Sequence, residues 1–369
     1  MKKRVYYIII LFLAFVHSTY AQIQYFTWQG KQREYLFNTP TNHDGSIPVL
    51  FFLHGIGETI TNCDEEFNFE QLSEDFGWAI VVPQALTQGI FGTMWNAGLI
   101  SSSIDDVGFL FALLDTLTVQ YQLDPDSVFF TGFSMGGFMT YRLAIEQGDR
   151  ITACAPVSGL ISLEDANKTP VAPVRILHIH GTNDNLVGYS GVTLGSTLGL
   201  GVDAILDYWQ DANGCSGEPT IDTLPNLKID GLRFIRYTYN CDTDLQHLKV
   251  VGGTHRWYHD ADLYDVGYED VIYEFFTGHS APSRTPAREK GHLVYYPNPT
   301  TGILNVQFDS DYPNTEIRVY DMYGKLVDVV GTTPTSSPHT VQIDLSRHSN
   351  GVYFVQNPNG TVAKVVLAH

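Results

Sequence analysis

The sequence predicts an α/β fold, with a mainly parallel sheet flanked by helices, followed by a small C-terminal all-β sandwich. Up to residue 276, short apolar runs rich in strand-forming residues alternate with helical patterns, and such alternation is typical of parallel sheets. After residue 291 only short strand-like runs separated by turns remain. Residues 277–291 are dominated by Pro, Ser and charged residues and contain almost no large apolar side chain, which indicates a linker.

Composition and charge narrow the class of protein. The chain has 369 residues, of which 44% are hydrophobic and 17% are charged. It can therefore bury a sizeable core, and wholesale disorder is excluded. It carries 40 acidic and 21 basic residues, which gives a net charge of −19. Such a chain repels phosphate backbones, so we expect no nucleic-acid partner.

The first residues have the pattern of an export signal. A basic start at residues 2–4 precedes an apolar run over 5–16, and small residues lead to Ala21. This combination predicts a signal peptide over residues 1–21, with the mature protein beginning at Gln22. The alternative is an uncleaved anchor helix, although the run is short for a membrane span. We expect no transmembrane segment after signal removal, because no later segment is apolar over that length.

The elements of residues 22–276 begin with an antiparallel hairpin, Tyr25–Trp28 and Tyr35–Asn38. Apolar runs then predict buried parallel strands over Ile47–Leu53, Ala79–Val82, Ser127–Thr131, Ile151–Val157 and Val174–Ile179. Helical spacing predicts helices over Ile104–Tyr121, Phe138–Gln147, Val202–Ala212 and Tyr264–Phe276. Residues 292–369 are expected to form the sandwich, with strands over Ile303–Phe308, Glu316–Tyr320, Lys325–Val330, Thr340–Ile343, Val352–Gln356 and Val362–Leu367.

A candidate nucleophile lies in the motif Gly132-Phe133-Ser134-Met135-Gly136, a G-x-S-x-G. The pattern alone is weak, but a predicted strand precedes it and a predicted helix follows it. That is the setting of the nucleophile elbow of α/β-hydrolases, in which a strained turn exposes the serine hydroxyl. The alternative is a glycine-rich turn whose serine is incidental. The sequence therefore predicts an α/β-hydrolase with Ser134 as nucleophile.

A serine nucleophile needs a base and an acid that orients the base. In this fold they follow the serine in the order acid, then histidine, each on a loop after a strand. Asp184 turns off the strand-like run 174–180, and His255 follows the run 247–251. We therefore predict a triad of Ser134, Asp184 and His255.

Other titratable residues have simpler interpretations. Asp105 and Asp106 begin a helical pattern and are expected to cap it. His178 and His180 alternate on a strand and so share one face, which favours a role in the core. His255 and His259 have the spacing of a metal pair, but no third ligand accompanies them. No metal site and no cofactor is expected.

The remaining site residues follow from the same fold. An oxyanion hole needs two backbone N–H donors, and we predict Met135, directly after the nucleophile, and Ile56 in the turn His54-Gly55-Ile56-Gly57. Gly57 is the alternative to Ile56, and a simple strand-ending turn is the alternative to a donor loop. Trp95 and Trp257 are the candidates for substrate contact, although core packing explains each equally well.

Four cysteines, Cys63, Cys154, Cys215 and Cys241, allow three complete pairings. Disulfides are plausible in an exported protein. Cys215 follows a turn and Cys241 ends a strand-like run, so this pair could close a local loop, and we expect that disulfide. The state of Cys63 and Cys154 stays open.

Residues 25–276 resemble a known family of secreted esterases: feruloyl esterases, acetylxylan esterases and polyhydroxybutyrate depolymerases of the α/β-hydrolase fold. The resemblance is carried by several motifs in order. These are Leu53-His54-Gly55, Trp95-Asn96, the run 104–109 (IDDVGF), Asp124-Pro125, the elbow at 132–137, the run 155–159 (APVSG), His180-Gly181-Thr182-Asn183-Asp184, the stretch 209–215, and the run 252–257 (GGTHRW).

This resemblance implies the same triad and a disulfide between Cys215 and Cys241. One departure concerns the residues around the base. Members of the family often have a third glycine and a proline there (G-G-G-H-x-W-P), where this chain has Thr254 and Tyr258. The departure leaves the expected chemistry in place, but it puts the pocket wall and hence the substrate in doubt.

The tail resembles the C-terminal sorting domain of type IX secretion substrates in the Bacteroidetes. Its motifs are the runs 296–302 (YPNPTTG), 319–325 (VYDMYGK) and 350–355 (NGVYFV). The resemblance implies the type IX secretion machinery as a partner, and a secreted or cell-surface location after outer-membrane export. A small carbohydrate-binding sandwich is the alternative.

Together these features predict a secreted serine esterase that acts through an acyl-enzyme. The first choice of substrate is a feruloyl or acetyl ester on plant cell-wall polysaccharide. Alternatives are a polyhydroxybutyrate or other polyester, a peptidase of the same fold, and a non-catalytic glycan-binding surface protein on a hydrolase scaffold.

Overall fold

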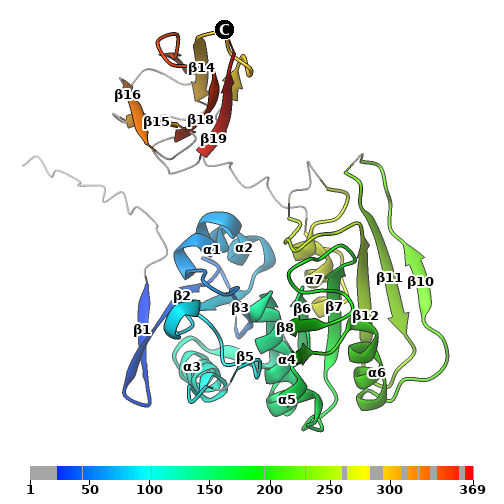
Figure 1. Ribbon diagram of the computed structural model, residues 1–369. Helices are drawn as coiled ribbons and strands as arrows, with labels where there is room; N and C mark the ends of the chain where they lie inside the picture. The colour runs from blue at the N-terminus through cyan, green and yellow to red at the C-terminus, as the bar shows by residue number, and fades with distance from the viewer. Residues whose placement is uncertain are drawn as a thin grey trace, which may run out of the picture. The chain divides into compact units, whose positions relative to one another are not determined.

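The computed structural model of the chain (Figure 1) describes residues 23–43, 45–100, 102–194, 196–228, 230–259, 264–282, 294–308, 315–321, 325–332, 339–356 and 362–368. Contacts divide the chain into two compact units, Met1–Arg284 and Thr285–His369. The predicted signal peptide, residues 1–21, lies outside the described residues, as do residues 283–291 of the predicted linker.

A ten-stranded sheet forms the centre of the first unit. Its strands lie in the order β1 (Gln24–Trp28), β2 (Lys31–Asn38), β4 (Ala79–Pro83), β3 (Ile47–Leu53), β5 (Leu123–Phe133), β6 (Ala153–Val157), β7 (Arg175–Gly181), β12 (Leu245–Val251), β11 (Arg233–Tyr239) and β10 (Thr220–Thr223). The six strands from β4 to β12 are parallel to their neighbours. Antiparallel pairs extend the sheet at both edges.

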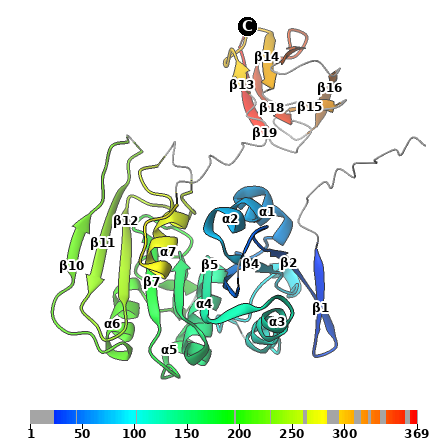
Figure 2. The same cartoon turned by 180° about the vertical axis from the view of Figure 1, so that it is seen from behind.

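Helices cover both faces of this sheet, and the two views agree on their arrangement (Figures 1 and 2). One face packs against α1 (Ile60–Phe67), α2 (Phe69–Phe76) and α7 (Tyr268–Thr277). The other packs against α3 (Asp106–Tyr121), α4 (Met135–Gln147), α5 (Leu163–Ala166) and α6 (Val202–Ala212). Short elements complete the unit: η1 (Gly89–Phe91), η2 (Gly148–Arg150), β8 (Val192–Leu194) and β9 (Ser196–Gly199).

The central strands are apolar on both faces because both faces are covered. Every residue of β4 and β6 is buried, as expected for parallel strands between two helical layers. The surface helix α6 instead buries one stripe, Val202, Ile205, Leu206 and Trp209, at the spacing of a single helical face.

The second unit contains only strands among its described residues. One sheet has the order β13 (Val294–Tyr296), β14 (Ile303–Phe308), β17 (His339–Asp344). The other has the order β16 (Leu326–Thr332), β15 (Thr315–Asp321), β18 (Gly351–Gln356), β19 (Val362–Leu367). Both are antiparallel, and their buried side chains form one core that includes Val306, Ile317, Ile343 and Val355. The predicted fold class, α/β with a small C-terminal all-β part, is confirmed.

Element boundaries differ from the prediction in several places, and two of these lie beside the predicted site. The predicted helix 138–147 begins at Met135, directly after Ser134. Helices α1 and α2 were not predicted, because each is short and Asn68 separates them in a left-handed conformation with φ 49°. Asn68 ends α1 and also caps α2, since its side chain accepts a hydrogen bond from the Gln71 N–H.

The described residues of both units contain no helix of the length and hydrophobicity that a membrane crossing requires. A disulfide joins Cys215 and Cys241, the pair expected from the sequence, 26 residues apart. It closes the segment that carries the edge strands β10 and β11. Cys63 and Cys154 are free and buried.

We predict that this disulfide stabilises the folded chain by constraining the unfolded chain. For a loop of 26 residues, loop-closure entropy gives a loss of about 3.5 kcal/mol in the free energy of unfolding when both cysteines become alanine. Chemical unfolding of the wild type and of the Cys215→Ala/Cys241→Ala variant measures this loss. As a control, reductant should destabilise the wild type and leave the variant unchanged. Equal stability of the oxidised and reduced wild type would contradict the prediction.

Candidate active site

The predicted site residues follow the ends of neighbouring parallel strands. His54 follows β3, Ser134 follows β5, Asp184 lies just after β7 and His255 just after β12. These strands run in the same direction, so their carboxyl ends meet at one edge of the sheet. The fold therefore gathers residues that are far apart in the sequence.

Ser134 lies at a sharp turn between β5 and α4. Its φ is 54° and its ψ is −116°, a left-handed-side conformation that non-glycine residues rarely adopt. Its N–H donates to the Val157 carbonyl at 2.9 Å, and its own carbonyl accepts from the Phe138 N–H at 3.1 Å. A Cβ atom on Gly136 would overlap the Leu53 carbonyl oxygen. Glycine at 136 is thus required for the helix to begin over the end of β3.

His255 and Asp184 form a hydrogen-bonded pair. The Nδ1–H of His255 donates to Oδ2 of Asp184 at 2.7 Å, so Nε2 of the ring is left to accept a proton. The other oxygen of Asp184 accepts from the N–H groups of Leu186, at 3.0 Å, and Val187, at 2.8 Å. Burial alone would raise the pKa of Asp184, but the hydrogen bonds from His255 and Val187 outweigh it and lower that pKa. Asp184 is therefore ionised at neutral pH.

Phe133 connects this pair with the elbow. Its ring centroid lies 4.8 Å from that of His255, and Phe133 immediately precedes Ser134 in the chain. The Ser134 side chain makes no capping hydrogen bond to α4. The ring that packs against His255 thus belongs to the residue directly before Ser134.

The loop after β3 is held by a neutral histidine. Nδ1–H of His54 donates to the Gly55 carbonyl at 2.6 Å. Its Nε2 accepts from the Ala85 N–H at 3.0 Å and pairs with the Gln84 side-chain amide at 2.8 Å. Burial lowers the pKa of His54 to about 4, so the ring keeps one acceptor nitrogen at neutral pH. The loop is therefore tied to the residues that follow β4.

The hydrogen bonds of this loop distinguish Ile56, the predicted oxyanion donor, from its neighbours Gly55 and Gly57. The Gly55 N–H donates to Oε2 of Glu58 at 2.7 Å, and the Gly57 N–H donates to the Thr93 carbonyl at 2.8 Å. The Gly57 N–H is thus already engaged, which favours Ile56 over the alternative donor Gly57. The Ile56 N–H has no acceptor in the described part of the chain, and Ile56 is 42% exposed. The second predicted donor, Met135, is the first residue of α4, where N–H groups lack intrahelical acceptors.

Trp95 packs in the core, the alternative considered for it from the sequence. Only 1% of its surface is exposed, and its indole N–H donates to the His54 carbonyl at 3.0 Å. Trp95 therefore supports the loop after β3 from within the core, and its predicted contact with substrate stays a prediction.

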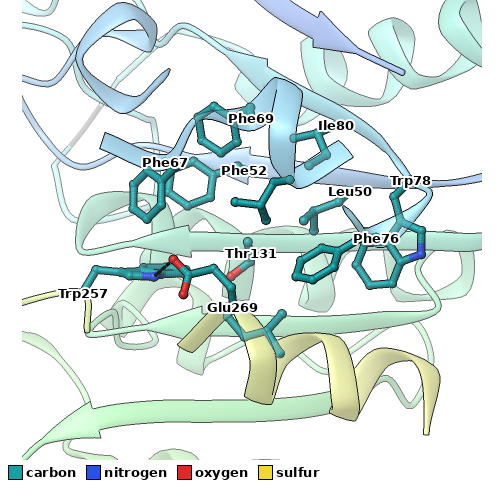
Figure 3. A pocket seen from close by; sticks show the side chains of 12 residues that line it. Leu50, Phe52, Phe67, Phe69, Phe76, Trp78, Ile80, Thr131, Trp257 and Glu269 are labelled. Atoms are coloured by element: carbon teal, nitrogen blue, oxygen red, sulfur yellow. Dashed lines mark hydrogen bonds between the residues drawn. The ribbon is translucent and has the colours of Figure 1, made fainter. Parts of the chain in front are cut away.

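Trp257 is also buried, at 5% exposure. It lines an interior cavity of about 20 Å³ with Phe52, Phe67 and Phe69 (Figure 3), room for about one water molecule. Its indole N–H donates to Glu269 at 3.0 Å. The predicted contact of Trp257 with substrate stays a prediction.

Sequence reasoning missed Glu58 and Val187. Glu58 accepts a hydrogen bond from the Gly55 N–H, and the Val187 N–H donates to the Asp184 side chain. Both contacts are made by loop geometry, and the only signal in the sequence was their closeness to the predicted site motifs.

Comparison with known proteins shows that the sequence of this chain is similar to those of several esterases. The chain is 33% identical over 259 residues to feruloyl esterase C of Emericella nidulans, covering 66% of this chain and 83% of that protein. It is 27% identical over 279 residues to a bifunctional acetylxylan esterase/xylanase of Neocallimastix patriciarum, covering 74% of this chain. It is 31% identical over 191 residues to feruloyl esterase B of Piromyces equi, covering 50% of this chain. The chain spans only 37% and 35% of the lengths of the latter two proteins.

Two family descriptions match parts of the chain. Residues 105–197 match the phospholipase/carboxylesterase family, and residues 294–367 match the secretion system C-terminal sorting domain. Among solved structures, an acetyl xylan esterase from Aspergillus awamori superposes with a TM-score of 0.50 at 15% identity, covering 69% of this chain and 99% of that one. This likeness shows the α/β-hydrolase fold of the first unit.

We predict that acid destabilises the fold through its buried neutral histidines. Burial lowers the pKa of His54 to about 4 and that of His247 to about 3, from 6.5. The unfolded chain binds protons near pH 6.5, whereas the folded chain does not until the lower values. Stability is therefore complete above pH 6.5 and is lost as the pH falls, by about 1.4 kcal/mol per pH unit for each histidine.

Chemical unfolding from pH 7 down to about 4 measures this loss. His247→Gln removes one of these titrations and should lessen the slope, while His43→Gln, which changes an exposed histidine, should leave it unchanged. A stability that is flat over this range would contradict the prediction.

Proposed function

The chain belongs to the family of the feruloyl esterase C proteins, and we propose that it acts as a secreted carboxylic ester hydrolase with Ser134, His255 and Asp184 as its triad. The observation that carries this proposal is the 2.7 Å hydrogen bond from His255 to Asp184. It lies at the sheet edge where Ser134 occupies the strained elbow.

The proposed reaction has two halves. Nε2 of His255 takes the proton of the Ser134 hydroxyl as the oxygen attacks the ester carbonyl, and Asp184 orients and stabilises the imidazolium. The proton then passes to the leaving alcohol, which departs and leaves an acyl-enzyme on Ser134. Water, activated by His255, attacks this ester and releases the acid. The reaction needs no cofactor.

The negative oxygen that forms in each half needs donors that are already in place. We assign this role to the N–H groups of Met135 and Ile56. Support comes from the engagement of the neighbouring Gly55 and Gly57 N–H groups elsewhere, and from the bonds of His54 and Trp95 that hold the loop.

The proposed substrate is a feruloyl or acetyl ester on plant cell-wall polysaccharide. The names of the similar proteins, feruloyl esterases and an acetylxylan esterase, support this class. We further propose that residues 1–21 direct export and that the C-terminal unit directs sorting by the type IX secretion machinery, which releases the enzyme or attaches it to the cell surface. The match of residues 294–367 to a sorting domain supports this route.

The test of the function is hydrolysis by the purified full chain, wild type beside Ser134→Ala, with methyl ferulate, acetylated xylan and hydroxybutyrate oligomers as substrates. We expect turnover of a feruloyl or acetyl ester and a loss of at least about 1,000-fold in the variant. A fluorophosphonate probe should label the wild type and not the variant. Turnover of the oligomers alone would keep the mechanism and change the substrate. A folded wild type that neither labels nor hydrolyses any of the three would favour a glycan-binding protein on a hydrolase scaffold.

The oxyanion assignment has its own test. Ile56→Pro removes the proposed donor, so we expect kcat to fall by about 100-fold to 1,000-fold with little change in KM. Ile56→Ala keeps the N–H and removes an exposed side chain, so its kcat should stay near that of the wild type. If both variants fold and have equal kcat, the Ile56 N–H is not the donor.

A further inference from the structure

Three histidines lie buried beneath the acid of the proposed triad. His178 and His180 lie on β7 and His247 on the neighbouring strand β12, and none is more than 2% exposed. The ring centroid of His178 lies 5.3 Å from those of both other rings. Imidazoles this deep in a core need a structural or functional reason, because burying polar groups is costly.

His178 and His247 bind within the core. Nδ1 of His178 pairs with the Tyr141 hydroxyl at 2.7 Å. His247 donates from Nδ1 to the His178 carbonyl at 3.0 Å and pairs through Nε2 with the Tyr189 hydroxyl at 2.8 Å. Neither ring has a hydrogen bond to Asp184 or His255.

His180 makes a different contact. Its Nε2 lies 2.8 Å from the carbonyl oxygen of Val187. A carbonyl only accepts hydrogen bonds, so Nε2 must carry the hydrogen. Nδ1 is buried and has no partner among the described residues. Burial also lowers the pKa of His180, which agrees with a neutral ring whose only hydrogen is on Nε2.

Val187 connects this ring with the proposed acid. Its carbonyl accepts from His180 and its own N–H donates to Oδ1 of Asp184 at 2.8 Å. Nε2 of His180 also lies 3.6 Å from Oδ2 of Asp184, the oxygen that accepts from His255. The Nε2 atom of His180 therefore lies near the carboxylate, and its hydrogen bond to Val187 fixes the backbone that holds the other carboxylate oxygen.

We propose that His180 is a positioning residue for catalysis: through the Val187 carbonyl it fixes the loop that aims the Asp184 carboxylate at His255. The proposal rests on the proposed function, because it assigns His180 to the acid of that triad. Leu186, which lies between Asp184 and Val187 in this loop, is 74% exposed. Packing of its side chain therefore does little to hold the loop. A displacement of about 1 Å in a catalytic group can cost about 100-fold in rate.

The first test uses the wild-type full chain and does not depend on activity. With ¹⁵N-labelled histidine, NMR distinguishes the Nε2–H from the Nδ1–H tautomer, and His180→Gln identifies the signal of His180. We expect a neutral Nε2–H ring at neutral pH. An Nδ1–H ring or an imidazolium would overturn the proposal.

The second test compares two substitutions of His180 by amide side chains of different length, glutamine and asparagine. The side-chain nitrogen of glutamine can occupy the place of Nε2, whereas that of asparagine is too short to reach the Val187 carbonyl. We expect His180→Gln to keep kcat within about threefold and His180→Asn to lower it by about 10-fold to 100-fold with little change in KM. His178→Asn is the matched control, because it removes a buried imidazole two residues away that does not contact Asp184. It should destabilise the fold and leave kcat per active site near that of the wild type.

Counting active sites separates positioning from simple destabilisation. Rates are counted per site titrated with a fluorophosphonate, so unfolded protein does not contribute. A merely structural role of His180 would lower the number of active sites and leave kcat per site unchanged, whereas a positioning role lowers kcat per site.

Equal kcat per site for His180→Asn and the wild type would overturn the proposal, as would equal losses in His180→Asn and His178→Asn. Failure of the proposed function is a separate result: the wild type would then hydrolyse no ester, while the tautomer measurement would still report on the bond between His180 and Val187.

Discussion

The active-site edge depends on how closely α4 approaches β3. At Gly136 there is no room for a Cβ atom against the Leu53 carbonyl, and at Gly137 a Cβ would lie 2.9 Å from Cα of Gly159. These contacts place the start of α4 over the end of β3 and beside the segment after β6. Consequently the elbow residue Ser134, the N–H of Met135 and the loop that begins at His54 lie together before any ligand arrives. The strained φ of Ser134 is held in place by this packing on both sides.

A second feature of the site is that carbonyl oxygens select the tautomers of its histidines. Gly55 binds Nδ1–H of His54, the His178 carbonyl binds Nδ1–H of His247, and Val187 binds Nε2–H of His180. In His255 the same selection is made by a carboxylate. Since a carbonyl cannot donate, each contact leaves a defined nitrogen as acceptor. In a chain with 40 acidic residues, burial keeps these interior imidazoles neutral by lowering their pKa, and the carbonyl contacts fix which nitrogen carries the hydrogen.

The sequence contained enough information for the fold class and for the placement of Ser134, Asp184 and His255 after neighbouring parallel strands. Burial imposes a direct pattern on the sequence of such elements. Strands β4 and β6 are apolar on both faces, and helix α6 is apolar along one face. Loop contacts leave no such pattern. Two such contacts are the hydrogen bond from Gly57 to Thr93 and the one from Trp95 to His54. Both result from tertiary packing between segments about 40 residues apart. The link from His180 to Asp184 also depends on the turn of the intervening loop, so alternation along β7 indicated only that His178 and His180 share a face.

The hydrogen bond between Gly57 and Thr93 has a consequence for how this chain can diversify. It fastens one end of the turn around η1 to the loop after β3, whereas Ile90 at the tip of that turn is 95% exposed. The fixed end preserves the backbone geometry of the loop that begins at His54, and the exposed Ile90 side chain has few packing constraints. Mutations at the tip can therefore accumulate in a lineage without weakening the core.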